Sequence, residues 1–170
     1  MTVIGAAPTT TQGAPGFAPR YRRRLWSVRH ARGLAALYRA FERSLRAAAP
    51  LVARIGAGRL ERPVAAVERR VKGALFDCKM CGQCVLSRTG LSCPTNCPKG
   101  LRNGPCGGVR ADGACEVVAD MPCVWVQAFD GARRIDGAGA SIPPLPPVDN
   151  RLLGRSSWLA VARDATTAAP

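Results

Sequence analysis

The sequence is poor in several features that mark particular classes of protein. It has no run of about 18 apolar residues, so it predicts no membrane-spanning helix. Residues 1–19 lack a basic start followed by an apolar stretch, so no secretory signal is expected. Histidine occurs once, as His30 among arginines. These absences favour a cytoplasmic protein without a catalytic histidine.

Acidic residues are also few, and the chain is short. At 170 residues it has no room for a catalytic barrel, which takes roughly 250 residues. It has 25 Lys and Arg against 11 Asp and Glu, and residues 1–72 hold 15 of the basic and 3 of the acidic side chains. Three interpretations of this basic part stay open: a solvated surface, docking on an acidic partner, and, least favoured, binding to nucleic acid.

Apolar periodicity predicts two helices in the basic part of the chain. Residues 1–19 contain little to bury and are expected to be disordered. Within residues 20–76, one amphipathic helix is predicted over about residues 27–48, and a second one begins with Pro63 in its first turn, after a break at residues 56–58. The two helices would bury their apolar stripes in a hairpin or against a partner.

Glycine and proline interrupt every periodic run in residues 77–130. Loops held by metal are expected there, because larger apolar residues are few, with a strand-like piece at residues 124–126. Residues 131–170 contain a polyproline stretch and are expected to form an extended, partner-binding strap. The predicted fold class is a small irregular metal-stabilised cysteine-rich domain with little regular structure, preceded by two N-terminal α-helices and followed by an extended tail.

Cysteine is concentrated in one block, where all eight residues are candidate metal ligands. They are Cys78, Cys81, Cys84, Cys93, Cys97, Cys106, Cys115 and Cys123. The first three form a Cys-x2-Cys-x2-Cys run, which can direct three thiolates at one 4Fe-4S cluster, and Cys93-Pro94 and Cys97-Pro98 both suit its fourth ligand. One or two clusters are predicted. Zinc in one or both sites is the alternative, whereas a disulfide framework is disfavoured without an export signal.

The cysteine block resembles a known module. The similarity rests on the run from Phe76 to Leu86, the Cys93-Pro94 and Cys97-Pro98 pairs, the segment Leu-Arg-Asn-Gly-Pro-Cys-Gly-Gly at residues 101–108, and residues 115–125. It is similar to the cysteine-rich C-terminal domain of methylenetetrahydrofolate reductases, which in acetogen-type enzymes is a separate small subunit. The resemblance covers about residues 63–130. It implies zinc or iron-sulfur bound by the eight cysteines, and a partner that is a flavin-containing barrel.

Two functions are consistent with these patterns. The first is an accessory iron-sulfur subunit of a methylenetetrahydrofolate reductase in one-carbon metabolism, relaying electrons to or from the flavin of the barrel subunit, with a further electron-transfer subunit as an additional partner. The second is a zinc-folded interaction module that stabilises a partner or binds RNA. The sequence shows no catalytic constellation and no flavin or nicotinamide site, so the chain is expected to be a non-catalytic subunit. Trp125 and Trp158 are either packing residues or interface anchors.

Overall fold

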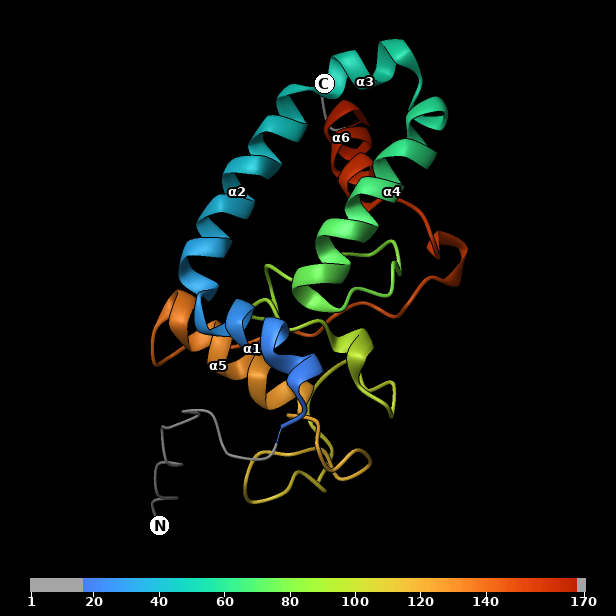
Figure 1. Cartoon of the computed structure of the whole chain (residues 1–170). Coiled ribbons are helices and arrows are strands. Elements are labelled where there is room, and N and C mark those ends of the chain that lie inside the picture. Colours follow the sequence, from blue (N-terminus) through green and yellow to red (C-terminus); the bar gives the residue numbers. More distant parts are fainter. Residues whose placement is uncertain (1–16, 168–170) are drawn as a thin grey trace.

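The computed structural model describes residues 17–167, and the predicted disorder of residues 1–16 lies outside the described residues. Six α-helices and three short 3-10 helices make up its regular structure (Figure 1). The α-helices are α1 (Arg22–Arg29), α2 (Ala31–Ala47), α3 (Ala49–Ile55), α4 (Ala57–Phe76), α5 (Val124–Asp136) and α6 (Ser157–Thr167). The 3-10 helices are η1 (Pro19–Tyr21), η2 (Pro94–Asn96) and η3 (Asn150–Leu152). Residues 17–167 contain no strand, and their one isolated bridge joins Ala114 to Pro122.

The predicted fold class is therefore wrong. Helices make up 56 % of the described chain, and two of them, α5 and α6, lie after the cysteine block, where a strand-like piece, a linker and an extended tail were expected. The apolar residues at 124–126 begin α5, because small residues at Ala128 and Ala132 continue one buried face at helical spacing. A run of three apolar residues does not by itself distinguish a strand from a helix.

The N-terminal helices differ in their boundaries from those predicted. The helix expected over residues 27–48 is divided into α1 and α2. The division lies at His30, whose backbone dihedral angles are outside the α-helical region. Pro50 does not end the helical part but lies in the first turn of α3. Gly56, with a φ of 93°, separates α3 from α4. The helices are therefore interrupted within the expected break at residues 56–58, at its first residue. Pro63 lies inside α4 instead of in its first turn, because α4 already begins at Ala57.

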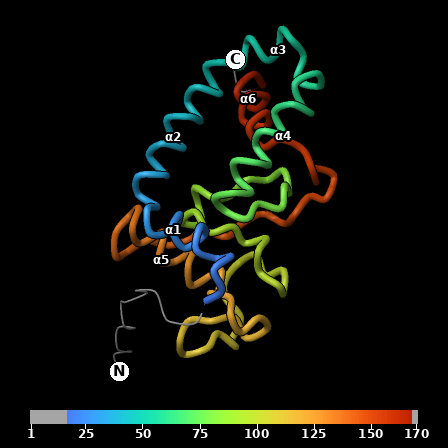
Figure 2. The backbone as a smooth tube through the Cα atoms, viewed as in Figure 1, coloured from blue at the N-terminus to red at the C-terminus, as the bar shows by residue number. Residues whose placement is uncertain are grey.

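The long helices α2 and α4 form two arms that α3 joins at one end (Figure 1). The C-terminal helix α6 packs against all three of them, burying Leu159 and Ala162. Helices α1 and α5 pack together at the other end. The chain after α5 crosses the molecule to reach α6, as Figure 2 shows, so the tail packs on its own chain.

The cysteine block is anchored on these helices. Leu86 and Leu91 pack with Ala31 of α2 and Phe76 of α4, which together form one core cluster. The buried Trp125 of α5 donates a hydrogen bond from Nε1 to the carbonyl of Leu101, 3.0 Å away. These contacts supply an apolar core that the isolated segment lacks. Across residues 17–167, each helix is either too short or too polar to cross a lipid bilayer.

Candidate metal centre

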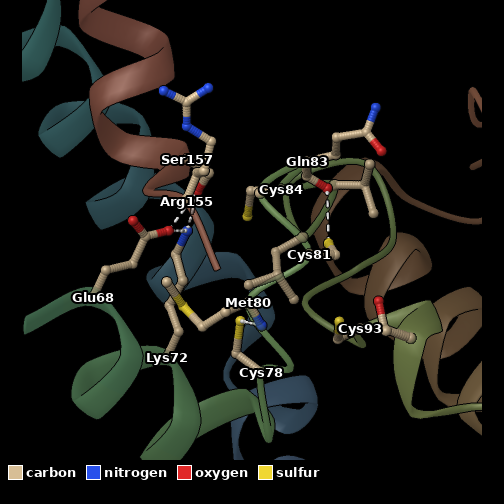
Figure 3. Close-up of a pocket in the computed structure, with 14 residues that line it drawn as sticks. Glu68, Lys72, Cys78, Met80, Cys81, Gln83, Cys84, Cys93, Arg155 and Ser157 are labelled. Carbon is tan, nitrogen blue, oxygen red and sulfur yellow. Dashed lines mark hydrogen bonds and ion pairs between the residues drawn. The ribbon is translucent and has the colours of Figure 1, made fainter. Parts of the chain in front are cut away.

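Four of the eight cysteines line a single pocket at the end of α4. Cys78, Cys81 and Cys84 come from the loop that follows the helix, and Cys93 comes from the residue before η2. Figure 3 shows the four side chains around this pocket. The structure thus brings the Cys-x2-Cys-x2-Cys run together with the first of its two candidate fourth ligands. Cys97, the other candidate, does not line the pocket.

Left-handed backbone turns fold the triplet into a tight loop. Asp77, which ends α4, has a φ of 53°, and Met80 and Gly82 follow with φ values of 52° and 75°. Asp77 and Met80 carry side chains, so this conformation costs each of them roughly 1 kcal/mol or more. Strained backbone of this kind is concentrated at functional sites, where it positions side chains. Here it turns three successive thiols toward one pocket.

The thiols have weak hydrogen-bond partners and are partly or fully buried. The sulfur of Cys78 accepts a hydrogen bond from the Met80 N–H at 3.3 Å, and Cys81 donates to the Gln83 carbonyl at 3.5 Å. Burial raises the pKa of the Cys78 thiol, and the neighbouring Cys84 and Cys81 raise it further. Burial also raises the pKa of Cys93 to about 11. Without a metal these two thiols are protonated at neutral pH, so metal binding would release protons.

A buried ion pair borders the same pocket. The Lys72 ammonium lies 2.7 Å from Oε1 of Glu68, one turn earlier on α4, and 2.8 Å from Oγ of Ser157 at the start of α6. Lys72 lines the pocket together with Cys84. Burial lowers the pKa of Lys72, but Cys84 and Glu68 outweigh that effect and the net shift is upward. The lysine therefore stays charged beside the thiols.

The Glu68 carboxylate is held in its ionised form by several donors. Oε2 accepts hydrogen bonds from the Ser156 hydroxyl at 2.6 Å and from the Trp158 N–H at 3.3 Å, and Oε1 accepts from Ser157. Burial raises the pKa of Glu68, but the Lys72 charge and these hydrogen bonds lower it more, to a net value below 4.5. The carboxylate thus holds the start of α6 in place beside the pocket.

The C-terminal tail lies directly on the cysteine loop. The Gly154 N–H donates to the Met80 carbonyl at 2.7 Å, and the Asp149 N–H donates to Oε1 of Gln83 at 2.8 Å. A Cβ at Gly82 would lie 2.2 Å from the Leu152 carbonyl oxygen, so only glycine permits this approach. The tail and the loop therefore form one structural unit.

The remaining cysteines are distributed over separate parts of the block. Cys97 and Cys115 belong to one apolar cluster with Met121, whereas Cys123 packs in another cluster beside Trp125. Cys106 donates a hydrogen bond to the Glu116 carboxylate at 3.3 Å. All eight cysteines are free thiols. Cys97, Cys106, Cys115 and Cys123 are therefore not brought together as a second group of four thiols.

The donor set at the pocket fits an iron-sulfur cluster or zinc, because both take thiolate ligands. Within residues 17–167, no three or more His, Cys, Asp or Glu side chains are grouped closely enough to hold a metal ion. The four thiols therefore share a pocket without forming a finished ligand set. Binding of a metal by these thiols would therefore require the cysteine loop to move.

Sequence reasoning did not identify the ion pair. Glu68 and Lys72 stand four residues apart on a helix, which is a spacing typical of an exposed ion pair, so nothing in the sequence indicates that the pair is buried. Trp125 and Trp158 pack within the chain: Trp125 is buried, and Trp158 stacks edge-on against Phe41 with ring centroids 4.9 Å apart. Packing therefore accounts for Trp125.

Comparison with known protein families identifies part of the chain. The model of a protein family described as "Methylene-tetrahydrofolate reductase C terminal" matches residues 58–150. The matched region includes most of α4, all eight cysteines, α5 and the first part of the crossing segment that follows it. No curated protein and no solved structure matches the chain.

Proposed function

The chain belongs to the family of methylene-tetrahydrofolate reductase C-terminal domains, and on that premise we propose that it is an accessory iron-sulfur subunit of such a reductase. In this role it relays electrons to or from the flavin of a separate barrel-fold catalytic subunit. The observation that carries the proposal is the single pocket lined by Cys78, Cys81, Cys84 and Cys93. Residues 17–167 contain no strand, so they do not form the barrel.

The four pocket cysteines would hold a 4Fe-4S cluster. When bound, such a cluster supplies one-electron transfer, which complements a flavin that takes up electrons singly and passes them on in pairs. The Met80 N–H, which already donates to the Cys78 sulfur, would remain a hydrogen-bond donor to the ligated sulfur. The tail packs directly on the loop at Gly82. Cys93 is favoured over Cys97 as the fourth ligand because Cys93 lines the pocket.

The N-terminal helices supply a surface for the catalytic subunit. A cavity of about 280 Å³ lies between α2 and α4, lined almost entirely by apolar side chains, and Leu37 and Val71 on its lining are exposed. The three acidic residues of residues 17–72 each pair with a cation, Glu42 with Arg46, Glu68 with Lys72 and Glu61 with Arg163, so basic side chains far outnumber acidic ones on these helices. A second copy of this basic chain would be repelled. The occupant that fits is an acidic surface of the reductase subunit.

Anaerobic purification tests the function directly. We expect coloured protein with iron and sulfide in equal amounts and a visible absorption that dithionite bleaches. Cys93→Ser should lose the cluster, whereas Cys97→Ser should retain the reducible signal of that cluster. Equal loss of the signal in both variants would contradict the assignment of the fourth ligand.

The zinc-folded interaction module is the other outcome of the same measurement. Colourless protein with stoichiometric zinc would remove electron transfer from the proposal. Binding of RNA with a steep salt dependence, without association with a barrel-fold reductase subunit, would favour a nucleic-acid role of the basic helices.

A further inference from the structure

The buried lysine beside the thiol pocket is fully enclosed by protein. The side chains of Lys72 and Glu68 are 3 % and 2 % exposed. Besides its contacts to Glu68 and Ser157, the Lys72 ammonium lies 5.4 Å from the ring centroid of Trp158 and 5.8 Å from that of Tyr38. Its position is fixed by α2, α4 and α6 together.

Stability alone does not account for this pair. Removing two charges from water costs several kcal/mol per ion, and apolar pairs of similar volume are often at least as stable. The Glu68 carboxylate is neutralised not only by Lys72 but also by the Ser156 and Ser157 hydroxyls and the Trp158 N–H. The ammonium charge is therefore not needed by Glu68 alone, and Lys72 lines the same pocket as the four thiols, Cys84 among them.

We propose that Lys72 is a positioning residue that donates a hydrogen bond to the ligated sulfur of Cys84 and raises the reduction potential of the cluster. This inference rests on the proposed function. A cluster bound by four thiolates becomes more negative by one charge when it takes up an electron. A fixed cation beside one ligand sulfur stabilises the reduced form more than the oxidised form. The low polarity of the site strengthens the effect.

The same geometry connects the potential to the C-terminal tail. Ser157 begins α6 and contacts both Lys72 and Glu68, so it fixes the direction in which the ammonium points. Displacement of α6 would loosen Lys72 without altering a cysteine. Residues 149–157 thereby influence the cluster from outside its ligand set.

The test is a redox titration of the full-length chain, monitored by electron paramagnetic resonance. We expect Lys72→Met to shift the midpoint potential to more negative values with iron content unchanged, and Lys72→Arg to recover most of the shift. Arg69→Met removes the same charge from an exposed position on α4 and is expected to leave the potential close to that of the wild type. Equal shifts in Lys72→Met and Arg69→Met would overturn the inference.

A second comparison covers the case in which Lys72→Met fails to fold because Glu68 is left buried without its cation. Glu68→Gln and the double variant Glu68→Gln/Lys72→Met differ only by the ammonium. The double variant should have the more negative potential. If the wild-type chain binds no cluster, the proposed function fails; if it binds one whose potential is the same with and without Lys72, only this inference fails.

Discussion

At the scale of single residues, Gly82 decides how closely the tail approaches the cysteine loop. Gly82→Ala adds a Cβ that would lie 2.2 Å from the Leu152 carbonyl oxygen, at a backbone φ of 75°. We expect the free energy of unfolding, measured in urea, to fall by more than the roughly 1–3 kcal/mol that strained backbone costs alone. Gly100→Ala is the control, because Gly100 has a φ of 65° with nothing within 4 Å. Equal losses would mean that the tail does not rest on Gly82.

Glu68 makes the stability of the protein depend on pH. Its pKa in the folded state lies below 4.5, so its contribution to stability is fully present above pH 4.5 and is lost as the pH falls through the folded-state pKa. We expect the stability difference between the wild type and Glu68→Gln to be constant at near-neutral pH and to shrink in acid. Urea unfolding midpoints across the acidic range measure it. A difference that does not change with pH would contradict the ionised, buried carboxylate.

Much of the site could be predicted from spacing, whereas its surroundings could not. Three cysteines at intervals of three residues have to share a loop, so it could be predicted from spacing that Cys78, Cys81 and Cys84 line one pocket, while metal binding by them stays a prediction. The candidate fourth ligand could not be chosen from spacing, since Cys93 and Cys97 have equivalent proline neighbours; in the structure Cys93 lines the pocket and Cys97 does not. The burial of Lys72 could not be predicted, because burial of a helix residue depends on which elements pack over it. Here that element is α6, which comes from the far end of the chain.

At the scale of elements, the cysteine block packs closely on α5. Replacing a helical glycine by alanine ordinarily stabilises a protein, but at this contact it should destabilise it. A Cβ at Gly131 would lie 1.9 Å from the Gly90 carbonyl oxygen, so Gly131→Ala should destabilise the protein by about 1–3 kcal/mol. Gly33 in α2 has nothing within 4 Å, and Gly33→Ala should stabilise it by about 0.5–1 kcal/mol. Thermal unfolding of the two variants should give shifts of opposite sign. Two shifts of the same sign would show that α5 does not pack on Gly90.

The helices that sequence reasoning missed share one property. The helices α3, α5 and α6 have 7, 13 and 11 residues, so a periodic pattern has little length in which to appear. They are stabilised by tertiary contacts: the Ser92 hydroxyl donates to the Val124 carbonyl at 2.8 Å, and Glu68 accepts from the first turn of α6. Longer segments with a regular apolar face, α2 and α4, were recognised in outline.

At the scale of the whole molecule, the uneven charge predicts how the partner binds. Residues 1–72 carry a net charge of +12, from 15 basic and 3 acidic side chains, and Arg39 and Arg43 on α2 are exposed. If an acidic face of the reductase subunit docks on this side, Arg39→Glu/Arg43→Glu should weaken binding at least about tenfold and reduce its dependence on salt. Dissociation constants for the purified pair at two ionic strengths measure both effects.

The matched control changes the net charge equally on the other part of the chain. Arg110→Glu/Arg133→Glu reverses two exposed arginines, one in the cysteine block and one at the end of α5. If attraction by total charge alone drove association, both double variants would lose affinity equally. Screening over about 8 Å at physiological salt instead leaves mainly local effects. A larger loss in the α2 variant therefore locates the interface on the N-terminal helices. Equal losses, or none, would place the reductase subunit elsewhere and leave the arginines as a solvated surface.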